Sequence, residues 1–517
     1  MKQRLRPYQE TAVEFLLRAR ENASELCYFV LPTGAGKTHV LAEFIRRTVS
    51  NGRVLVVVHR AELVKQHEAR YCRFGLDVGS LRAGQFVNRD APVLVAMVQS
   101  LTDARLATWI ARGPIAALLI DECHHAAPGT RYASIVEQVR NVHSSALVAG
   151  CTATPFRADS RRMQDVLPRC VFARDISDMA EARILARPIG VPIELASLDL
   201  SSVHIRKGEF VERELAKSIT GRPSRELVSA SLPHVKDRLG LVFAADVAHA
   251  HEIYSLYRSH DIPCDVIVGS TPSAERDAIL ARWRKRKSGL IVNVMVLSEG
   301  FNEPEVSVIV LTSPTASPVK YLQVIGRGLR RTKTKTECLI LDVTPRECDD
   351  RQVLLDSVLL AGDGMGEPKP KGPKSARSRQ PRERNTWVSI DGAHALSIGG
   401  GRLWIVYKRS DGSGLWDGHL TRHRETLDTI AAAPAPEVLE HVHRLLVAEG
   451  PNPLTQRDAP WRDSPASDRQ IGFLARYNPK AASLARRDGW TSGAASDAIN
   501  VAQAQAALSR LRSGGVA

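Results

Sequence analysis

The sequence predicts two tandem α/β domains, each built on a parallel sheet, followed by a small C-terminal α+β region. Three observations support this fold class. The chain has 517 residues, of which 44% are hydrophobic and 25% charged, as expected for several packed domains. Short apolar runs rich in β-branched residues alternate with helical patterns, which is typical of parallel strands covered on both faces. Apolar periodicity is then interrupted over residues 362–384, before a shorter region of β-rich and helical patterns.

The first series of apolar runs predicts an N-terminal domain over residues 1–160. A polar or Gly-rich turn and then a helical pattern follow each run, and one helix is predicted over residues 38–49. The predicted strands cover residues 27–31, 54–58, 93–97, 117–120 and 146–150.

A second series of apolar runs predicts a second domain over residues 236–361. Residues 161–235 are expected to connect the two domains and to begin the second one. No sequence repeat relates the two halves, so any duplication is structural only. The predicted strands cover residues 241–244, 264–267, 290–294, 306–311 and 337–342.

The remaining chain divides by composition into three parts. Residues 362–384 are rich in Pro, Gly, Lys and Arg, and predict a basic flexible linker that is either a tether for phosphates or a soluble spacer. Residues 385–430 alternate β-rich runs with Gly/Asp turns, which predicts a small antiparallel module. Residues 431–517 predict a helical tail with helices near 436–448, 468–476 and 492–511.

The net charge and the cysteine pattern indicate the class of binding partner and the cellular compartment. The net charge of +15 makes nucleic acid the first candidate partner, with a solvated basic surface as the alternative. The eight cysteines stand singly, without a CxxC pair, which predicts free thiols in a reducing cytoplasm. No run approaches the roughly 18 apolar residues of a membrane span, so no membrane partner is expected.

A Gly-rich turn, LPTGAGKT, joins the first predicted strand to the helix after it. Backbone N–H groups in such a turn can surround phosphate oxygens at the positive end of a helix dipole. Lys37 is expected to reach the β- and γ-phosphates of ATP, and the Thr38 hydroxyl to bind Mg²⁺. Leu31 stands where the longer form of the motif has a leading Gly, and a Gly-rich helix cap is the alternative. The candidate phosphate-binding residues are Thr33, Gly34, Ala35, Gly36, Lys37 and Thr38.

The segment DECHH follows the buried run at residues 117–120, so its carboxylates lie at the carboxyl end of a strand, where open α/β sheets bind ligands. Asp121 is suited to hold the Mg²⁺ of the nucleotide through water, and Glu122 to orient and deprotonate the attacking water. The alternative is a zinc site formed by Cys123, His124 and His125. Structural zinc sites use pairs of ligands separated by two to four residues, a spacing that is absent here.

Four motifs in order carry a resemblance to a known family. LPTGAGKT, DECHH, TATP (from Thr152 to Pro155) and QVIGRGLR (from Gln323 to Arg330) resemble those of superfamily 2 helicases of the DEAD/DEAH type. The chain looks most like the bacterial and phage DExH branch that includes RadD and XPB-like helicases. The resemblance covers about residues 3–345 and implies two RecA-like domains with ATP in the cleft between them. The cysteine-rich segment of RadD-type members is missing.

The resemblance also implies roles in the first domain. Gln9 resembles the residue that reads the adenine edge, with Arg6 supporting it. A plain helix start is the alternative for this short match. His124 stands where the family histidine couples the nucleotide site to the segment from Thr152 to Thr154, which gives it a role without metal.

In the second domain, Gln323, Arg327 and Arg330 resemble the last motif of the family. Guanidinium groups brace the γ-phosphate only in a closed cleft, and Arg330 is expected to be the arginine finger with Arg327 as its neighbour. Gly300 and Asn302 resemble the segment that links nucleotide and nucleic acid. Asn302 replaces the acid usual in the family, and its amide can hydrogen-bond a ribose hydroxyl.

Nucleic acid is expected to follow the strand ends on one side of the two sheets. Backbone N–H groups, hydroxyls and one guanidinium would hold phosphates without reading the sequence, although each of these residues taken singly is compatible with an ordinary loop role. The candidate contacts are Arg60, Gln99, Ser100, Gly269 and Thr271.

The combined prediction is an ATP- and Mg²⁺-dependent helicase that moves along nucleic acid and unwinds it. The alternatives are a double-strand translocase that never separates strands and a nucleic-acid clamp switched by ATP with negligible turnover. The resemblance favours DNA over RNA, and a protein partner could use the C-terminal region.

Overall fold

The computed structural model describes the chain in several segments, and the fold follows from these. Several predicted features lie outside the described segments. They are Gly300, Asn302, the predicted linker, and most residues of the predicted helices near 436–448 and 468–476. The described residues are 5–22, 25–154, 163–206, 209–297, 303–345, 387–390, 393–399, 402–409, 411–422, 425–434, 437–438, 441–442, 465–468, 470–471, 475, 479–488 and 490–513.

The first sheet has eight strands in the order β4-β3-β5-β2-β6-β7-β1-β8. All neighbours are parallel except β3 and β4. The strands are β1 (Leu26–Val30), β2 (Arg53–Val58), β3 (Val78–Arg82), β4 (Gln85–Val87), β5 (Val93–Met97), β6 (Ile115–Asp121), β7 (Leu147–Thr152) and β8 (Arg169–Ala173). The helices are α1 (Pro7–Glu21), α2 (Lys37–Thr48), α3 (Ala61–Arg73), α4 (Asp103–Ile110), α5 (Arg131–Val142) and α6 (Ile176–Glu181).

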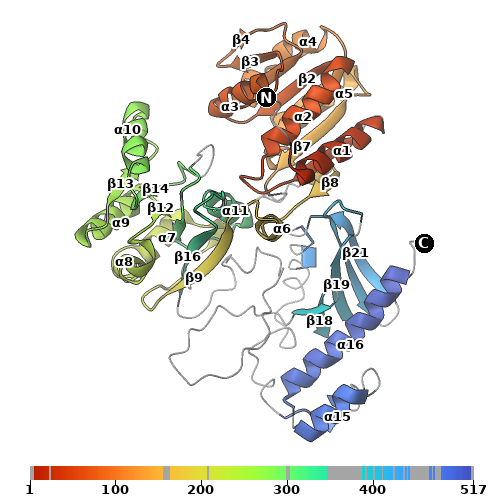
Figure 1. Ribbon diagram of the computed structural model, residues 1–517, viewed down its shortest axis with the longest axis vertical. Helices are drawn as coiled ribbons and strands as arrows, with labels where there is room; N and C mark the ends of the chain where they lie inside the picture. Colours follow the sequence, from red (N-terminus) through yellow and green to blue (C-terminus); the bar gives the residue numbers. More distant parts are fainter. Residues whose placement is uncertain are drawn as a thin grey trace. The chain divides into compact units, whose positions relative to one another are not determined.

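The central strands of this sheet are almost completely buried. Every residue of β6 is buried, as is all of β2 except Arg53, because helices cover both faces. The α1 helix packs along α2, as Figure 1 shows in red. All five predicted strands are present. The strand β8 pairs with β1, so the first sheet extends beyond the expected boundary at residue 160.

The second sheet has six parallel strands in the order β13-β14-β12-β15-β16-β9. The strands are β9 (Arg187–Leu195), β12 (Leu239–Phe243), β13 (Cys264–Ile267), β14 (Gly289–Asn293), β15 (Val308–Leu311) and β16 (Glu337–Pro345). The helices are α7 (Glu212–Ile219), α8 (Arg222–Val235), α9 (Val247–Ser259), α10 (Ser273–Arg284) and α11 (Pro318–Ile325). A short antiparallel hairpin is formed by β10 (Ile205–Arg206) and β11 (Glu209–Phe210).

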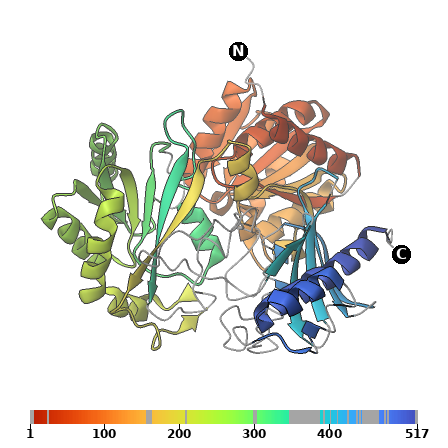
Figure 2. The same cartoon turned by 60° about the horizontal axis from the view of Figure 1, so that its bottom comes forward.

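Residues 367–517 form a separate compact unit. Its sheet is an antiparallel meander of β17 (Trp387–Ile390), β18 (Ala393–Gly399), β19 (Arg402–Lys408), β20 (Trp416–Arg422) and β21 (Glu425–Ala433). The helices are α15 (Pro479–Asp488) and α16 (Ser492–Ser513). Figures 1 and 2 show α16 lying across the sheet, and its Ala504 and Leu508 pack on Ala395 and Ile405.

The predicted fold class is therefore confirmed: two parallel-sheet α/β domains precede an accessory region with an antiparallel sheet. Within the described segments, no helix is long and apolar enough to cross a membrane.

Candidate active site

The phosphate loop joins β1 to α2 through two glycines with left-handed backbones. Gly34 and Gly36 both have φ +88°, which L side chains rarely adopt, and Gly36 is the N-cap of α2. A Cβ on Gly36 would lie 2.5 Å from the Gln9 side-chain nitrogen. The sequence therefore needs glycine here both for the turn and for the close packing of α1 against it.

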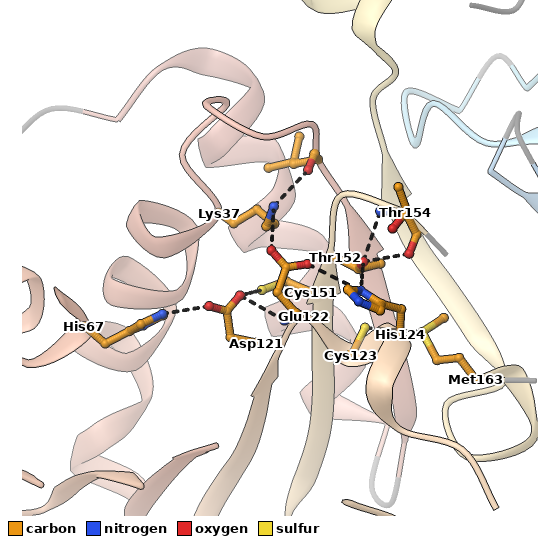
Figure 3. Close-up of polar contacts among 11 residues, drawn as sticks. Lys37, His67, Asp121, Glu122, Cys123, His124, Cys151, Thr152, Thr154 and Met163 are labelled. Atoms are coloured by element: carbon orange, nitrogen blue, oxygen red, sulfur yellow. Dashed lines mark hydrogen bonds and ion pairs between the residues drawn. The ribbon is translucent and has the colours of Figure 1, made fainter. Parts of the chain in front are cut away.

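Lys37 begins α2 and extends toward the end of β6. Its Nζ lies 3.5 Å from the Glu122 carboxylate and 3.5 Å from the Leu31 carbonyl oxygen (Figure 3). The side chains of Lys37 and Glu122 are 11% and 23% exposed, so this ion pair is partly shielded from water. The phosphate loop and the DECHH segment thus meet through two opposite charges.

Asp121 ends β6 and is held by three donors. The Nε2 atom of His67 lies 2.8 Å from Asp121 Oδ2, while the Glu122 backbone N–H and the Cys151 thiol donate to Oδ1 over 3.0 and 3.1 Å (Figure 3). Burial acts to raise the pKa of the Asp121 carboxyl, but His67 and Lys37 more than offset it and the pKa lies below its ordinary value. The carboxylate is therefore ionised and fixed in direction.

Glu122 has a left-handed backbone, with φ 49° and ψ 54°. This conformation is uncommon for a residue with a side chain and turns the carboxylate back toward Lys37. Burial acts to raise the pKa of Glu122, yet Lys37 and His124 hold it well below its usual range. The residue is an ionised carboxylate, as a general base requires.

His124 connects the end of β6 to the end of β7. Its Nδ1 lies 3.0 Å from Thr152 Oγ1 and 3.5 Å from the Glu122 carboxylate (Figure 3). The Thr152 hydroxyl donates to the Thr154 carbonyl and accepts from the Thr154 N–H. Because the hydroxyl hydrogen is used in this way, His124 Nδ1 must be the donor to Thr152. A continuous polar chain runs from Glu122 to Thr154.

The predicted adenine reader, Gln9, lies on α1 against the phosphate loop. Its amide nitrogen donates to the Ala35 carbonyl over 3.1 Å, and its amide oxygen accepts from the Arg6 N–H over 3.0 Å. The Tyr8 hydroxyl donates to the same Ala35 carbonyl over 2.6 Å. The two side chains on α1 thereby fix the loop, a role of Tyr8 that no sequence motif indicated.

The second domain brings its last motif to the phosphate loop. A Cβ on Gly34 would lie 3.1 Å from Arg330 Cγ, and a Cβ on Gly326 would lie 2.8 Å from Thr33 Cβ. Arg327 is buried, and Arg330, whose pKa is lowered by burial, is half-buried. The structure therefore brings Arg330 to the phosphate loop, while Arg327 directly follows Gly326, whose backbone lies beside Thr33, and Gln323 is half-buried on α11.

A buried lysine supports the loop that carries these arginines. Lys335 is 7% exposed, and its Nζ donates to the carbonyl oxygens of Gly328 and Val306 over 2.8 and 2.6 Å. Burial lowers the pKa of its amine to about 8. No pattern in the sequence indicated this contact, because lysines in a basic run are usually solvated.

The candidate nucleic-acid residues all follow carboxyl ends of strands. Arg60 and Gln99 are exposed after β2 and β5, and Gln99 donates to the His59 carbonyl. Gly269 and the half-buried Thr271 follow β13. Ser100 is only 5% exposed, which differs from the accessible hydroxyl expected of a phosphate contact.

Cys123 packs against a methionine, and His125 packs among aromatic and imidazole rings. The Cys123 thiol lies 3.4 Å from the Met163 sulfur, and His125 packs among the rings of His59, His124 and Tyr132. Within the described segments, no group of three or more His, Cys, Asp or Glu side chains is arranged to hold a metal.

Exchanging Cys123 for Ala is expected to leave ATP hydrolysis nearly intact. The change removes one buried sulfur and should lower the free energy of unfolding by about 1 kcal/mol, as other small deletions in cores do. Steady-state hydrolysis and thermal unfolding measure the two effects. A loss of hydrolysis greater than the loss of folded protein would instead support a metal site at this cysteine.

Mg²⁺ fits this site only as an ion that arrives with phosphates. Mg²⁺ is usually bound by one or two carboxylates together with substrate phosphates and water. Asp121 is a buried, ionised carboxylate beside the phosphate loop, and Thr38 stands at the start of α2. Asp121 and Thr38 would therefore suit a Mg²⁺ ion that binds together with the phosphates of a nucleotide.

Three family models match the chain. Residues 2–157 match the family "Type III restriction enzyme, res subunit", and residues 225–332 match "Helicase conserved C-terminal domain". Residues 373–511 match "Mitochondrial helicase Irc3, C-terminal domain", which identifies the accessory region as a known module.

Relatives cover most of the chain. A Schizosaccharomyces pombe protein, named as a candidate mitochondrial ATP-dependent helicase irc3, is 30% identical over 92% of this chain and 87% of its own length. The DNA 3'-5' translocase XPB2 of Sulfurisphaera tokodaii is 25% identical over 67% of this chain and 83% of its own.

Among solved structures, the Type ISP restriction-modification enzyme LlaBIII bound to DNA shares the fold. Its TM-score is 0.51 at 15% identity, over 67% of this chain and 28% of that one. The chain therefore belongs to the Irc3-like ATP-dependent helicases of superfamily 2, DExH type, and is an ATP-hydrolysing enzyme that acts on nucleic acid.

Proposed function

We propose that this helicase hydrolyses ATP with water activated by Glu122 and that it acts on DNA. The observation that carries the assignment is the polar chain from Lys37 through Glu122 and His124 to Thr152. It joins the phosphate loop, a fixed carboxylate and the end of β7 in one connected set of side chains.

The ion pair between Lys37 and Glu122 defines the starting state of the cycle. The phosphates of ATP offer Lys37 a stronger negative partner than one carboxylate, so its ammonium turns to the β- and γ-phosphates. Glu122 is then released to accept a proton from the attacking water. Asp121 and Thr38 would hold Mg²⁺, which supplies positive charge at the phosphate oxygens.

The two arginines make hydrolysis depend on the position of the second domain. Arg330, assigned as the finger, and Arg327 donate hydrogen bonds to the γ-phosphate only when α11 lies against the phosphate loop. The close approaches of Gly326 to Thr33 and of Gly34 to Arg330 support this assignment. Gln323 on α11 and the segment from His124 to Thr154 would transmit the change between the domains.

Adenine and ribose contacts complete the nucleotide site. Gln9 and Arg6 would bind the adenine edge once the amide of Gln9 exchanges part of its contact with Ala35 for the base. Gly300 and Asn302 remain assigned to the link between nucleotide and nucleic acid.

Nucleic acid would be held at the carboxyl ends of strands by Arg60, Gln99, Gly269 and Thr271, with Ser100 contributing through its backbone. Such phosphate contacts grip a strand without reading sequence. DNA is favoured over RNA because the XPB2 relative is named a DNA translocase. The enzyme would work in the reducing cytoplasm, a proposal supported by cysteines that stand singly in the sequence, without a CxxC pair.

The proposed domain limits are those expected from the sequence, except that the first domain reaches Ala173 and the second begins at Arg187 with β9. The C-terminal unit would contact DNA or a protein partner.

One experiment tests the proposed substrate. We expect single-stranded or forked DNA to raise the rate of ATP hydrolysis and forked DNA to be unwound, with RNA less effective on both counts. A panel of single-stranded, forked and blunt DNA and RNA measures hydrolysis and strand displacement, with the Lys37→Ala protein as the inactive control.

Each other outcome of this panel points to a named alternative. Stimulation by duplex without displacement would replace unwinding by double-strand translocation. Binding of nucleic acid with negligible turnover would replace the motor by a clamp. A larger effect of RNA would overturn the assignment of DNA.

A further inference from the structure

A buried histidine on α3 contacts the aspartate that is assigned to Mg²⁺. His67 is 2% exposed and stands between Asp121 on β6 and Tyr71 one turn further along its own helix. Its Nε2 lies 2.8 Å from Asp121 Oδ2 and its Nδ1 lies 2.7 Å from the Tyr71 hydroxyl. Figure 3 shows the imidazole pointing at the Asp121 carboxylate, while Lys37 points at Glu122.

The hydrogen positions on His67 follow from its partners. An ionised carboxylate offers only acceptors, so Nε2 must carry a hydrogen and donate it to Asp121. The Tyr71 hydroxyl is fully buried, and its hydrogen bond to Nδ1 keeps the ring from turning. The helical spacing of four residues places both side chains on one face of α3.

The same bonds determine which part of Asp121 is open to a further ligand. A carboxylate has about four acceptor positions, two on each oxygen. Among the described residues, Oδ1 accepts from the Glu122 N–H and the Cys151 thiol, while Oδ2 accepts from His67 alone. The remaining position is on Oδ2, the oxygen whose direction His67 sets.

We propose that His67 is a positioning residue that directs Oδ2 of Asp121 toward the Mg²⁺ of the bound nucleotide, with Tyr71 fixing the imidazole. The inference rests on the proposed role of Asp121. His67 itself does not touch nucleotide or metal. A partner of this kind orients a metal-binding side chain, and its loss costs about 10- to 100-fold in metal affinity or activity.

Two amide substitutions separate this role from simple packing. In H67Q the side-chain nitrogen can reach the place of Nε2 and still donate to Asp121. In H67N the shorter amide lies near the place of Nδ1, where it can bond Tyr71 but cannot reach Asp121. Both variants are neutral and polar, so they differ mainly in which of the two bonds they keep.

The readout is the gain in nucleotide affinity that Mg²⁺ confers. A fluorescent, non-hydrolysable ATP analogue is titrated into the full chain with excess Mg²⁺ and again with EDTA, without nucleic acid. We expect H67N to reduce the gain about tenfold and H67Q to retain most of it. Affinity in EDTA should be unchanged in both, and thermal unfolding confirms that each variant is folded.

Other outcomes overturn the proposal. If H67N and H67Q lose the gain equally or keep it equally, or if affinity falls in EDTA as well, His67 serves only packing. Y71F provides a further folded variant, and it should lose less of the gain than H67N because the bond to Asp121 remains.

A D121N protein separates this inference from the function on which it rests. If D121N binds the analogue with the full Mg²⁺ gain, the assignment of Asp121 fails and the role of His67 fails with it. If D121N loses the gain while H67N keeps it, only the role of His67 is wrong. Neither result depends on stimulation by nucleic acid.

Discussion

Exchanging Glu122 for Gln is expected to reduce the rate of ATP hydrolysis by about 10²- to 10⁴-fold, the range that general-base catalysis contributes. The amide keeps the shape of the side chain but cannot take a proton from water. It also removes the negative charge that lies 3.5 Å from Lys37, so nucleotide should bind at least as tightly as in the unchanged protein. Hydrolysis with saturating nucleic acid and equilibrium binding of ATP measure the two effects.

The matched control for this change is Glu14→Gln, which makes the same chemical change on the exposed face of α1 and should leave hydrolysis unaltered. A Glu122→Gln protein that retains more than a tenth of the activity would show that another group activates the water. Loss of nucleotide binding together with hydrolysis would show instead that Glu122 builds the site rather than acting in catalysis.

Exchanging Arg330 for Ala is expected to lower turnover by about 10³-fold or more, as the loss of an arginine finger does in related phosphoryl-transfer reactions. The guanidinium serves the transition state more than the ground state, so the fall should appear in kcat, with little change in KM for ATP. The half-buried position of Arg330 beside Gly34 keeps its charge close to the phosphates and away from bulk water.

The neighbouring Arg331→Ala change serves as the control, since it removes the same charge from the same basic run and should leave basal hydrolysis unchanged. Turnover is measured with and without nucleic acid. Equal losses of turnover in Arg330→Ala and Arg331→Ala would mean that the basic run acts through its total positive charge and not through one guanidinium. A loss confined to KM would assign Arg330 to nucleotide binding.

The first part of the site could be predicted because its residues are adjacent in the sequence and stand at strand ends. LPTGAGKT and DECHH each lie directly after a buried apolar run, and parallel strands bring their carboxyl ends to one edge of the sheet. The pairing of Lys37 with Glu122 follows from this topology. The positions of the two motifs at the ends of parallel strands are therefore enough to predict that Lys37 and Glu122 meet.

His67 could not be predicted in the same way, because its partner Asp121 is 54 positions away and the two meet only through the packing of α3 against the sheet. Its helix shows ordinary amphipathic spacing, in which a histidine is usually a core or surface residue. The burial of Lys335 could not be predicted for a similar reason, since it depends on the carbonyl oxygens of Val306 and Gly328, which are distant in the sequence or in an adjoining turn.

Of the strands that the sequence did not predict, β3 and β8 are continuous five-residue strands, whereas β4 and β9 are short or interrupted. The β4 strand has three residues, and β9 contains Pro188, Gly190 and Pro192, residues that weaken a strand signal. As an edge strand, β9 can accommodate proline because it pairs with β16 on one side only. The strands β4 and β9 therefore depend on their neighbours in the sheet more than on a local strand pattern.

The burial of Lys335 also makes this residue a chemical reporter of the second domain. Reagents that acylate amines need an accessible, unprotonated nitrogen. Both hydrogen bonds of Lys335 Nζ must therefore break before such a reagent can reach it. Surface lysines such as Lys285 and Lys333 will be modified in the native protein, whereas Lys335 becomes reactive when the arginine-bearing loop opens. Labelling at a single lysine can thus follow the opening of this loop without any added probe.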